Sequence, residues 1–486
     1  MTLLTNLEAL GSISDLVNGT KWNADELRRA VLNRVAFLTD KEIGPGSLVL
    51  ISHGGTPFFF ADLLAVWQLG AGAACLNATL TRNELENITK FVEPKALLRG
   101  PGETPKDLKG VSEFDLEQQR GEAGAVIETF DEDNPALILF TSGTTGDPKG
   151  VVHTFRSISE RLKNNWKYLS KDTLSKTLSV LPTHFGHGLI GNCLTPLFAD
   201  CDLYLYPRPG IAGAANLGSV LDENEITFMS SVPSFWKVVL KASKKPTKET
   251  LKQVSVGSAP LTADLWAAIQ NWAGINNVVN MYGITETANW AAGVSGVGAK
   301  LQDGLVGTMW GGEVNVLPKD GTQSPTGEGE ILLKTPSVMQ GYLKRPDLTA
   351  EVLLKGGWYK TGDWGTVSRD GVIRLLGRTK TEINKAGIKI LPEEIDMLLE
   401  KHPRVIEACA FGVPDLISGE TVAVAVTIKK GQSLKPSDLR AWCRDKIRPD
   451  GIPEKWFMVT EIPKTDRGKI NRGVVREYCL NREQEK

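Results

Sequence analysis

The segment Thr141–Gly150 constrains this chain more than any other stretch of its sequence. It reads TSGTTGDPKG and combines small hydroxyl residues with three glycines and one lysine, Lys149. Glycine lets backbone N–H groups approach a ligand closely, and successive N–H groups in such a turn form a concavity that binds anions. The composition therefore predicts a loop that wraps a polyphosphate, with Lys149 as an additional mobile cation.

The residues on either side of this loop predict its place in the fold. Ala136–Phe140 is an unbroken apolar run, typical of a strand that is buried on both faces. After the loop, apolar residues recur at spacings of three and four, which predicts a helix; they are Phe155, Ile158, Leu162 and Trp166. The loop is therefore expected to join a buried strand to a helix. It differs from the common nucleotide-binding loop because Lys149 is followed by Gly150 and not by Ser or Thr.

Length and composition narrow the class of protein. A chain of 486 residues is too long for one ordinary domain, so two to four units are expected. The formal net charge of -1 gives no basic bias toward nucleic acid. Apolar runs such as Phe58–Leu69 are too short to span a bilayer, and Met1–Leu10 has no basic cluster of the kind that begins a signal peptide. We expect no nucleic-acid partner and no transmembrane segment.

The cysteines indicate a reducing compartment, and we expect the protein to be cytoplasmic. They are scattered without a CxxC pair, which argues against a disulfide framework or a zinc site. Most are expected to be small core residues. The six positions are Cys75, Cys193, Cys201, Cys409, Cys443 and Cys479.

Strand-like and helical patterns alternate from about residue 24 to residue 290, which predicts parallel sheet covered by helices. The length of this region favours two such sheets. The expected strands include Ser47–Ile51, Thr177–Leu181, Asp202–Tyr206 and Asn277–Met281, and an expected helix is Ala263–Trp272.

The pattern changes near residue 301. Residues 301–379 are rich in glycine and short strands, including Val372–Leu376, and predict a small antiparallel barrel. Gly377–Thr381 is polar and is expected to be a linker. Beyond it, Pro392 with Glu393 and Glu394 predicts a helix start, and Thr421–Ile428 alternates as a strand does. The prediction is therefore an α/β chain: a large N-terminal domain (1–379) of two parallel-type sheets plus the barrel, and a small α+β domain (380–486).

Further short motifs carry groups suited to a nucleotide. Met281–Thr287 follows an expected strand and offers Tyr282 for stacking on a base, Thr285 for a phosphate oxygen and Glu286 for Mg²⁺. Val256–Pro260 and Tyr359–Asp363 are expected turns, the second ending in a carboxylate suited to a ribose diol. Lys469, after a glycine near the C-terminus, is placed to neutralise charge between a carboxylate and a phosphate. Each motif alone is equally typical of a solvated turn.

Taken together and in order, these motifs resemble the adenylate-forming superfamily of acyl-CoA synthetases, peptide-synthetase adenylation domains and beetle luciferases. The resemblance runs from roughly residue 25 to residue 475. It rests on the loop Thr141–Gly150, the Tyr-Gly-x-Thr-Glu block at 282–286, Thr-Gly-Asp at 361–363, Gly-Arg at 377–378 and Gly-Lys at 468–469. Such enzymes activate a carboxylic acid with ATP and Mg²⁺ to an acyl-adenylate, which a thiol then attacks.

The resemblance assigns roles to individual residues. It implies that the β- and γ-phosphates lie against Thr141, Ser142, Gly143, Thr144, Thr145 and Lys149. It implies that Gly257, Ser258, Ala259 and Pro260 line the adenine slot with Tyr282 stacked on the ring. Thr285 would touch the α-phosphate, Glu286 the magnesium, and Asp363 and Arg378 the ribose. Lys469 would bridge the acyl carboxylate and the α-phosphate.

It also implies a mobile C-terminal domain. Lys380 matches the hinge position about which the small domain turns between the two half-reactions. After that rotation Lys469 leaves the site, and Lys385, Ala386 and Gly387 arrive to form the tunnel for the thiol of coenzyme A.

The acyl pocket is expected at Pro182–Leu189 and after the Tyr282 block. When Pro182 and Gly188 are aligned with the family, Phe185 falls on the usual gating His and His187 on a second frequent His, so His184 and Phe185 both stay open as the gate. Peptide-synthetase domains for α-amino acids usually carry an Asp in this segment, and none of these residues is acidic. The substrate is therefore expected to lack an α-amino group. Further pocket candidates are Gly283, Asn289 and Trp290, the last suited to cap the cavity around a short, medium or aromatic acid.

The leading hypothesis is an AMP-forming acid–thiol ligase that makes an acyl-CoA. A close alternative delivers the acyl group to the phosphopantetheine of an acyl carrier protein, whose thiol arm is the same. A luciferase-like oxygenase and a non-catalytic nucleotide-binding protein are the other classes considered.

Overall fold

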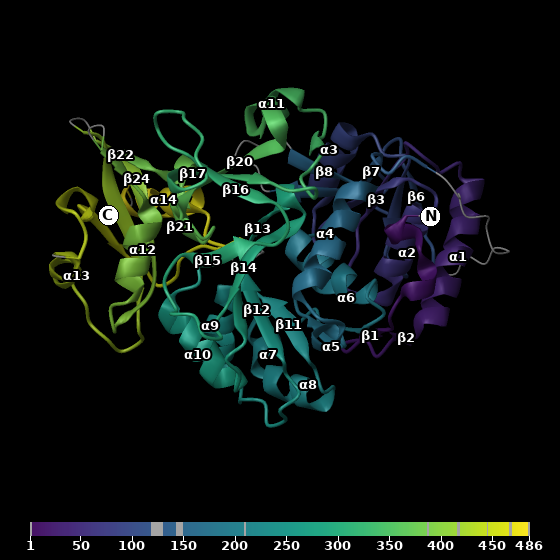
Figure 1. Ribbon diagram of the computed structural model, residues 1–486, viewed down its shortest axis with the longest axis horizontal. Helices are drawn as coiled ribbons and strands as arrows, with labels where there is room; N and C mark the ends of the chain where they lie inside the picture. Colours follow the sequence, from purple (N-terminus) through teal and green to yellow (C-terminus); the bar gives the residue numbers. More distant parts are fainter. Residues whose placement is uncertain are drawn as a thin grey trace.

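The computed structural model describes residues 2–117, 130–141, 149–208, 210–385, 388–415, 418–444, 446–465 and 469–484. Figure 1 shows an elongated molecule in which the N-terminal third, the middle of the chain and the C-terminal part follow one another along the long axis. Among the described residues, no helix combines the length and the apolar character needed to cross a bilayer.

The first sheet has seven strands in the order β18-β8-β7-β4-β3-β5-β6. Its strands β7, β4, β3, β5 and β6 run parallel to one another. The strands are β3 (Leu48–Ile51), β4 (Gly72–Cys75), β5 (Ala96–Arg99), β6 (Ser112–Asp115), β7 (Pro135–Thr141), β8 (Lys149–Thr154) and β18 (Gly341–Tyr342). The associated helices are α1 (Ala24–Asp40), α2 (Pro57–Gln68), α3 (Arg82–Val92) and α4 (Phe155–Tyr168).

One expected connection is wrong. The glycine-rich loop does not lead from a strand into a helix, because β8 follows it and pairs antiparallel with β7 before α4 begins. Val151 and Val152 are the apolar residues of strand β8, directly after the loop, and they are too few to show a periodicity of their own. The loop is thus the connection of a β-hairpin, and its residues 142–148 lie outside the described residues.

The second sheet contains the remaining N-terminal strands and runs β16-β17-β20-β21-β15-β14-β13-β12-β11-β9-β10-β1-β2. The stretch from β13 to β1 is parallel, so the prediction of two parallel sheets is confirmed. Its parallel strands are β1 (Ile13–Asp15), β9 (Lys176–Ser179), β10 (Asp202–Leu205), β11 (Phe228–Ser231), β12 (Gln253–Gly257) and β13 (Val278–Ile284), with β2 (Lys21–Trp22) added at the edge. Helices of this region are α5 (Lys171–Leu174), α6 (Thr195–Leu197), α7 (Gly210–Ala215), α8 (Leu217–Glu223), α9 (Pro233–Ala242) and α10 (Ala263–Ala273).

The strands after β13 are antiparallel, as the change of pattern near residue 301 predicts. They are β14 (Asn289–Ser295), β15 (Leu305–Met309), β16 (Glu313–Leu317), β17 (Gly327–Lys334), β19 (Leu353–Leu354), β20 (Trp358–Val367) and β21 (Ile373–Arg378), with α11 (Pro346–Val352) between them. Their hydrogen-bonded order is a continuous run with β16 at one end, and a closed barrel stays a prediction.

Two expected loops in this region are strands instead. Tyr359–Asp363 lies inside β20, where Gly362 at φ +72° makes an irregularity rather than a chain reversal. Gly377 and Arg378 end β21, and the predicted linker is reduced to a single 3₁₀ turn, Thr379–Thr381. The glycines and polar side chains that indicate loops are here accommodated by cross-strand pairing, such as that of Asp363 with Arg378.

The C-terminal part forms a separate five-stranded sheet with its own helices, in agreement with the predicted α+β character. The strands are β22 (Ile383–Lys385), β23 (Ile388–Ile390), β24 (Val405–Asp415), β25 (Gly419–Ile428) and β26 (Lys455–Met458), and the helices are α12 (Pro392–Glu400), α13 (Pro436–Cys443) and α14 (Arg472–Gln484). We call residues 383–484 the C-terminal unit. Its buried apolar clusters contain only its own residues.

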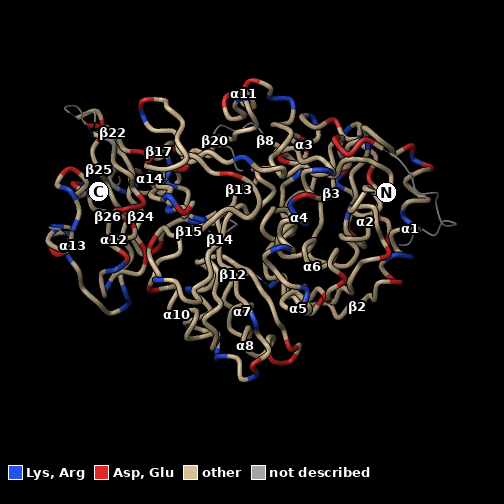
Figure 2. The backbone as a smooth tube through the Cα atoms, in the orientation of Figure 1, with Lys and Arg blue, Asp and Glu red and all other residues tan. Residues whose placement is uncertain are grey.

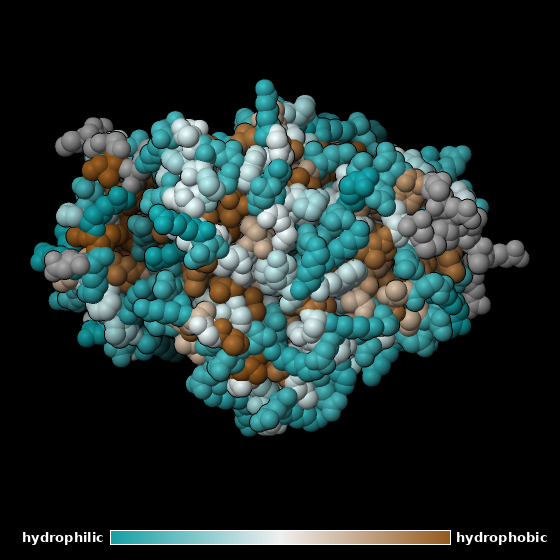
Figure 3. All heavy atoms as spheres, in the orientation of Figure 1, coloured by the Kyte–Doolittle hydropathy of each residue, from teal (hydrophilic) through white to brown (hydrophobic). Residues whose placement is uncertain are grey.

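Burial follows the sequence pattern closely. All six cysteines are buried and unpaired, which confirms their prediction as core residues. Figure 2 shows positive and negative residues interspersed along the chain, and in Figure 3 hydrophilic residues cover most of the visible face between scattered apolar patches.

Candidate active site

The candidate site begins at the carboxyl ends of parallel strands β9, β11, β12 and β13. Because parallel strands end at the same edge, the segments that follow them gather there, which is where open α/β sheets bind ligands. This places His184–His187, Ser258 and Tyr282 near one another although they are separated by up to about a hundred residues in sequence.

The hairpin strands β7 and β8 bring the ends of the glycine-rich loop together. Thr141 and Lys149 are registered partners, so the undescribed residues between them leave and return at one place. The ammonium of Lys149 lies 3.9 Å from Glu286 Oε1 and 3.7 Å from the ring centroid of Tyr342. The predicted phosphate-loop lysine and the predicted magnesium ligand are therefore neighbours in space.

Glu286 is held by a tyrosine that the sequence analysis did not identify. The hydroxyl of Tyr342 donates to Glu286 Oε1 at 2.8 Å and lies 3.4 Å from the hydroxyl of Tyr359. Burial, and then the adjacent Glu286 carboxylate, raise the pKa of Tyr342, which keeps it a proton donor. Tyr342 reaches this place because β18 pairs with β8, a contact for which no local motif exists.

His153 supports the same segment from β8. Its Nε2 lies 2.7 Å from the carbonyl oxygen of Thr285, which can only accept, so Nε2 carries the proton. Burial lowers the pKa of His153 to about 4, so the ring is neutral at physiological pH. His153 thus fixes the backbone at Thr285 from outside the site.

Asp363 and Arg378, the predicted ribose contacts, are cross-strand partners in β20 and β21. Arg378 Nε donates to Asp363 Oδ1 at 2.8 Å, and the Tyr282 hydroxyl donates to Asp363 Oδ2 at 2.6 Å. Burial raises the pKa of Asp363, and burial together with the Asp363 charge raises that of Tyr282. Tyr282 is 6% exposed and anchors the Asp363 carboxylate through its hydroxyl, and its stacking on adenine stays a prediction.

The pocket histidine His187 is built into the sheet edge. Its Nδ1 lies 2.9 Å from the hydroxyl of Ser258 and its Nε2 lies 2.6 Å from that of Ser230. Ser258 has φ +67°, in the left-handed region, so the turn after β12 aims its side chain at the ring. Burial lowers the pKa of His187 to about 3, and the positive charge of Lys469 adds to this lowering.

Lys469, whose charge acts on His187, belongs to the C-terminal unit. It sits in a turn in which the Thr465 N–H donates to the carbonyl of Lys469 at 2.8 Å and Lys464 pairs with Ile470.

Asn289 and Trp290, predicted pocket residues, pack against the π-helix His187–Leu194. The Trp290 ring packs edge-on against His187 at 5.8 Å. Asn289 Nδ2 and Trp290 Nε1 are buried donors without a hydrogen-bond partner among the described residues. The two side chains lie over Gly191, where a Cβ would come within 2.2 Å of Asn289 Nδ2. Gly283 pairs with Trp290 at a β-bulge, and the rings of His184 and Phe185 lie 4.1 Å apart at the other end of the segment.

The predicted thiol-tunnel residue Lys385 lies apart from this place. Lys385 pairs with Glu454 within the C-terminal unit, and β22 lies at the far end of the molecule from β8 in Figure 1. Ala386 and Gly387 lie outside the described residues, as do Ser142, Gly143, Thr144 and Thr145. Gly257 ends β12, and Ala259 and Pro260 follow Ser258 directly after it; the backbone of Lys380 lies in the 3₁₀ turn that precedes the C-terminal unit.

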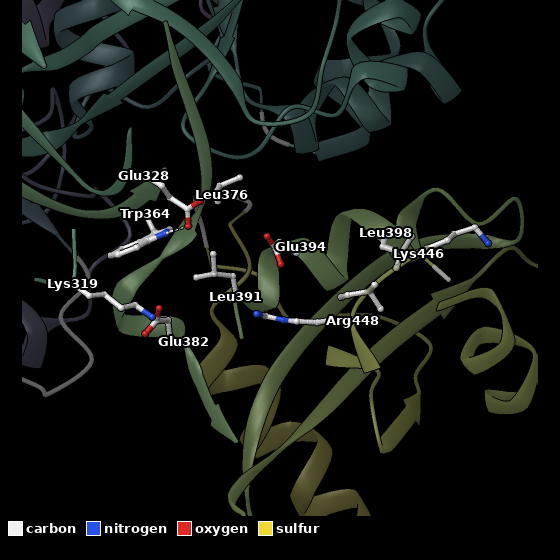
Figure 4. A pocket seen from close by; sticks show the side chains of 11 residues that line it. Lys319, Glu328, Trp364, Leu376, Glu382, Leu391, Glu394, Leu398, Lys446 and Arg448 are labelled. Carbon is white, nitrogen blue, oxygen red and sulfur yellow. Dashed lines mark hydrogen bonds between the residues drawn. The ribbon is translucent and has the colours of Figure 1, made fainter. Parts of the chain in front are cut away.

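A cleft of about 690 Å³ lies apart from these residues, where β17, β20 and β21 face α12 and the segment after α13. Figure 4 shows Trp364 hydrogen-bonded to Glu328 on one side and Glu394, Leu391 and Arg448 on the other. It is a cleft between the C-terminal unit and the rest of the chain, and none of the predicted site residues lines it.

The arrangement agrees with comparisons to known proteins. Residues 8–343 match the model of the AMP-binding enzyme family, and residues 394–469 match the AMP-binding enzyme C-terminal domain. The chain is 29% identical to oxalate–CoA ligase of Arabidopsis thaliana, over 97% of this chain and 95% of that protein, and 32% identical to sulfoacetate–CoA ligase of Cupriavidus necator, over 70% and 66%. The crystal structure of ATP-bound MatB from Rhodopseudomonas palustris superposes with a TM-score of 0.87 at 26% identity, covering 98% of this chain and 99% of that one. The chain belongs to the family of AMP-binding enzymes.

Proposed function

We propose that this enzyme couples a small carboxylic acid without an α-amino group to coenzyme A, using ATP and forming AMP. The observation that carries the proposal is the convergence of Lys149 on Glu286, 3.9 Å apart, and of Arg378 and Tyr282 on Asp363; the positive charge of Lys469, in the C-terminal unit, also acts on His187. The same site holds Lys149, Glu286, Asp363 and Arg378, which supply the charges that a nucleotide triphosphate needs.

The nucleotide is proposed to lie between the hairpin loop and β20. Lys149 and the loop Thr141–Thr145 take the β- and γ-phosphates, Thr285 takes the α-phosphate, and the pair Asp363–Arg378 takes the ribose hydroxyls. Glu286 offers a carboxylate oxygen, the ligand type that Mg²⁺ prefers together with phosphate oxygens, so the donor set fits this ion. When bound, Mg²⁺ would offset the negative charge of the phosphates.

In the first half-reaction a carboxylate oxygen of the acid attacks the α-phosphorus. The bond from that phosphorus to its bridging oxygen breaks, and pyrophosphate leaves with the electron pair. Two anions must meet for this to happen, and Lys469, between them, lowers the repulsion. In the second half-reaction the thiolate sulfur attacks the acyl carbonyl carbon and AMP leaves, which requires Lys469 to withdraw and Lys385–Gly387 to arrive by rotation about Lys380.

The pocket supports a small acid that carries a second group able to accept hydrogen bonds. His184, Phe185, His187, Asn289 and Trp290 include no carboxylate to hold an ammonium, and the buried Trp290 ring limits depth. The unpartnered N–H groups of Asn289 and Trp290 would be satisfied by acceptor oxygens of the substrate. Oxalate and sulfoacetate, the acids named for the two relatives, are both short and have a second anionic group.

The test is carboxylate-dependent exchange of pyrophosphate into ATP, measured over a panel of short mono- and dianionic acids. We expect exchange with at least one acid, loss of exchange in Lys469→Ala by about a hundredfold or more, and little change in Lys464→Ala. Lys464 lies in the same turn but pairs with Glu407, which makes it a matched control. No exchange with any acid, or full exchange in Lys469→Ala, would contradict the proposal.

The acceptor is tested separately. Free coenzyme A and a phosphopantetheinylated carrier protein are each added to the preformed adenylate, and AMP release is followed. Faster release with coenzyme A supports the proposal, whereas release with the carrier protein alone would establish the alternative.

A further inference from the structure

The described residues form no buried apolar cluster that the C-terminal unit shares with the rest of the chain. Each buried apolar cluster of the described residues lies wholly on one side of the 3₁₀ turn at 379–381. No apolar core of these residues therefore fixes one orientation of the unit. Interfaces of this kind between parts of one chain resemble transient protein–protein contacts, whose geometry depends on a few specific interactions.

Two ion pairs cross this interface at the end of α12. Glu400 Oε2 lies 3.0 Å from the ammonium of Lys237 on α9, and the ammonium of Lys401 lies 2.5 Å from Asp303 Oδ2. Glu400 and Lys401 are adjacent in sequence and opposite in charge. Across the interface, the carboxylate of Glu400 therefore pairs with a lysine and the ammonium of Lys401 pairs with an aspartate. These four residues form the two interface ion pairs.

Both carboxylates are already fixed within their own part of the chain. Glu400 Oε1 accepts from the Ala408 N–H at 3.4 Å, and Asp303 Oδ1 accepts from the Ala263 N–H at 2.9 Å, at the start of α10. Their side chains are only 18% and 12% exposed. Conformational freedom is thus lost mainly by the two lysines when the pairs form, which makes each pair more favourable than one between two mobile side chains.

The interface is open beside these pairs. The cleft of about 690 Å³ shown in Figure 4 separates the strands β17, β20 and β21 from α12 on one side. A second cleft of about 320 Å³ is lined by residues that include Asp303 and Lys401 themselves. Because the two clefts interrupt close packing on either side of the ion pairs, we expect these pairs to determine much of the orientation in which the C-terminal unit docks.

We propose that Lys237, Glu400, Asp303 and Lys401 form a latch that positions the C-terminal unit so that Lys469 faces His187, and that they are positioning residues for adenylate formation. This inference rests on the proposed function. If the partners were exchanged, Lys237 would face Lys401 and Asp303 would face Glu400, and the like charges would repel. The charge pattern therefore favours one orientation of the C-terminal unit. The rotation that admits the thiol must break both pairs, and the latch therefore favours the first half-reaction over the second.

A charge swap tests the latch by activity. Lys237→Glu and Glu400→Lys are made singly and together, with Lys176→Glu as a control because Lys176 forms a pair of similar length (2.9 Å) with Glu225 away from the interface. Each single variant is expected to slow pyrophosphate exchange about three- to tenfold, with thioester formation from preformed adenylate unchanged, and the double variant is expected to recover to within about twofold. Lys401→Met, which removes one cation without placing like charges together, is expected to slow exchange about threefold.

The position of the unit is measured independently of activity. Dyes on Glu249→Cys and Gln432→Cys, two exposed positions on opposite sides of the interface, report the interdomain distance by single-molecule energy transfer. The single variants are expected to broaden the distance distribution in low salt and the swap to narrow it again. Unchanged distributions and exchange rates in the single variants, or a double variant no better than either single one, would overturn the latch. If the unmodified enzyme exchanges with no acid, the proposed function fails, and the distance measurement still judges the latch.

Discussion

The hydroxyl of Tyr282 donates a 2.6 Å hydrogen bond to Asp363 and so joins β13 to the strand that carries the predicted ribose contact. Tyr282→Phe keeps the ring but removes the donor, leaving Asp363 with Arg378 alone. A hydrogen bond to a charged group is worth about 1.5 kcal/mol, so we expect the KM for ATP to rise about tenfold in pyrophosphate exchange. Tyr168→Phe is the control, because the Tyr168 hydroxyl bonds the carbonyl of Met309 at the surface; an equal effect in both variants would contradict this role.

Glu286→Gln tests the predicted magnesium ligand. The amide keeps the shape and can still accept from Tyr342, but it loses the charge that faces Lys149. We expect the exchange rate to fall about a hundredfold and the Mg²⁺ concentration for half-maximal rate to rise. The measurement is a Mg²⁺ titration at fixed ATP. An unchanged Mg²⁺ requirement would remove Glu286 from the metal site.

His153 makes stability depend on pH. Its pKa is about 4 in the folded protein and near 6.5 when unfolded, so the unfolded state binds more protons between these values and stability falls as the pH drops through that range. Between pH 7 and pH 5 this loss amounts to about 2 kcal/mol, and His153→Gln should lose about that much less on acidification. Urea unfolding at the two pH values measures it. His402→Gln, at a partly buried histidine, should change the pH dependence much less.

Arg472 holds two carboxylates inside the C-terminal unit. It lies 2.7 Å from Asp396 and 3.0 Å from Glu393, and burial raises the pKa of Asp396 to about 7. Arg472→Met leaves both acids buried without a cation and should lower the free energy of unfolding by about 3 kcal/mol. Because the folded variant binds protons more readily than the unfolded chain, this loss should be larger at pH 8 than at pH 5.5. Arg482→Met, at an exposed arginine of the same helix, should cost little.

Lys380→Pro tests the predicted hinge. Proline fixes φ and removes the N–H, so a rotation about this residue should be hindered while the present arrangement is retained. We expect adenylate formation to remain in part and thioester formation to be lost, as measured by the two half-reactions separately. Lys380→Ala should preserve both, and equal loss of both half-reactions in the proline variant would argue against the hinge.

Most of the fold follows from patterns within one segment of sequence. Apolar runs such as Ala136–Phe140 and the helical spacing from Phe155 to Trp166 predict β7 and α4 directly, because the pattern of buried residues lies within each segment. The hairpin strand β8 escaped prediction because six residues joined to a glycine-rich loop show no period. Within strand β20 the sequence predicts a turn at Gly362, because glycine is found in loops more often than in irregularities within a strand.

The site divides in the same way. Residues inside motifs, such as Glu286, Asp363 and Lys469, are open to prediction because the resemblance rests on those motifs, and their roles stay predictions. Tyr342 and Ser230 could not, because each contacts its partner only through the pairing of distant strands. The direct ion pair of Asp363 with Arg378 likewise depends on the register of β20 and β21, which the sequence alone leaves open.

Gly191, in the π-helix beneath Asn289 and Trp290, has a consequence for altering substrate range. A methyl group at Gly191 would clash with both side chains, so the proposed pocket cannot be made shallower by a small substitution at this position of the helix. To accept bulkier acids, Trp290 would be replaced by a smaller residue. The volume vacated by the indole would then lie against the backbone of Gly191, which side chains already approach closely.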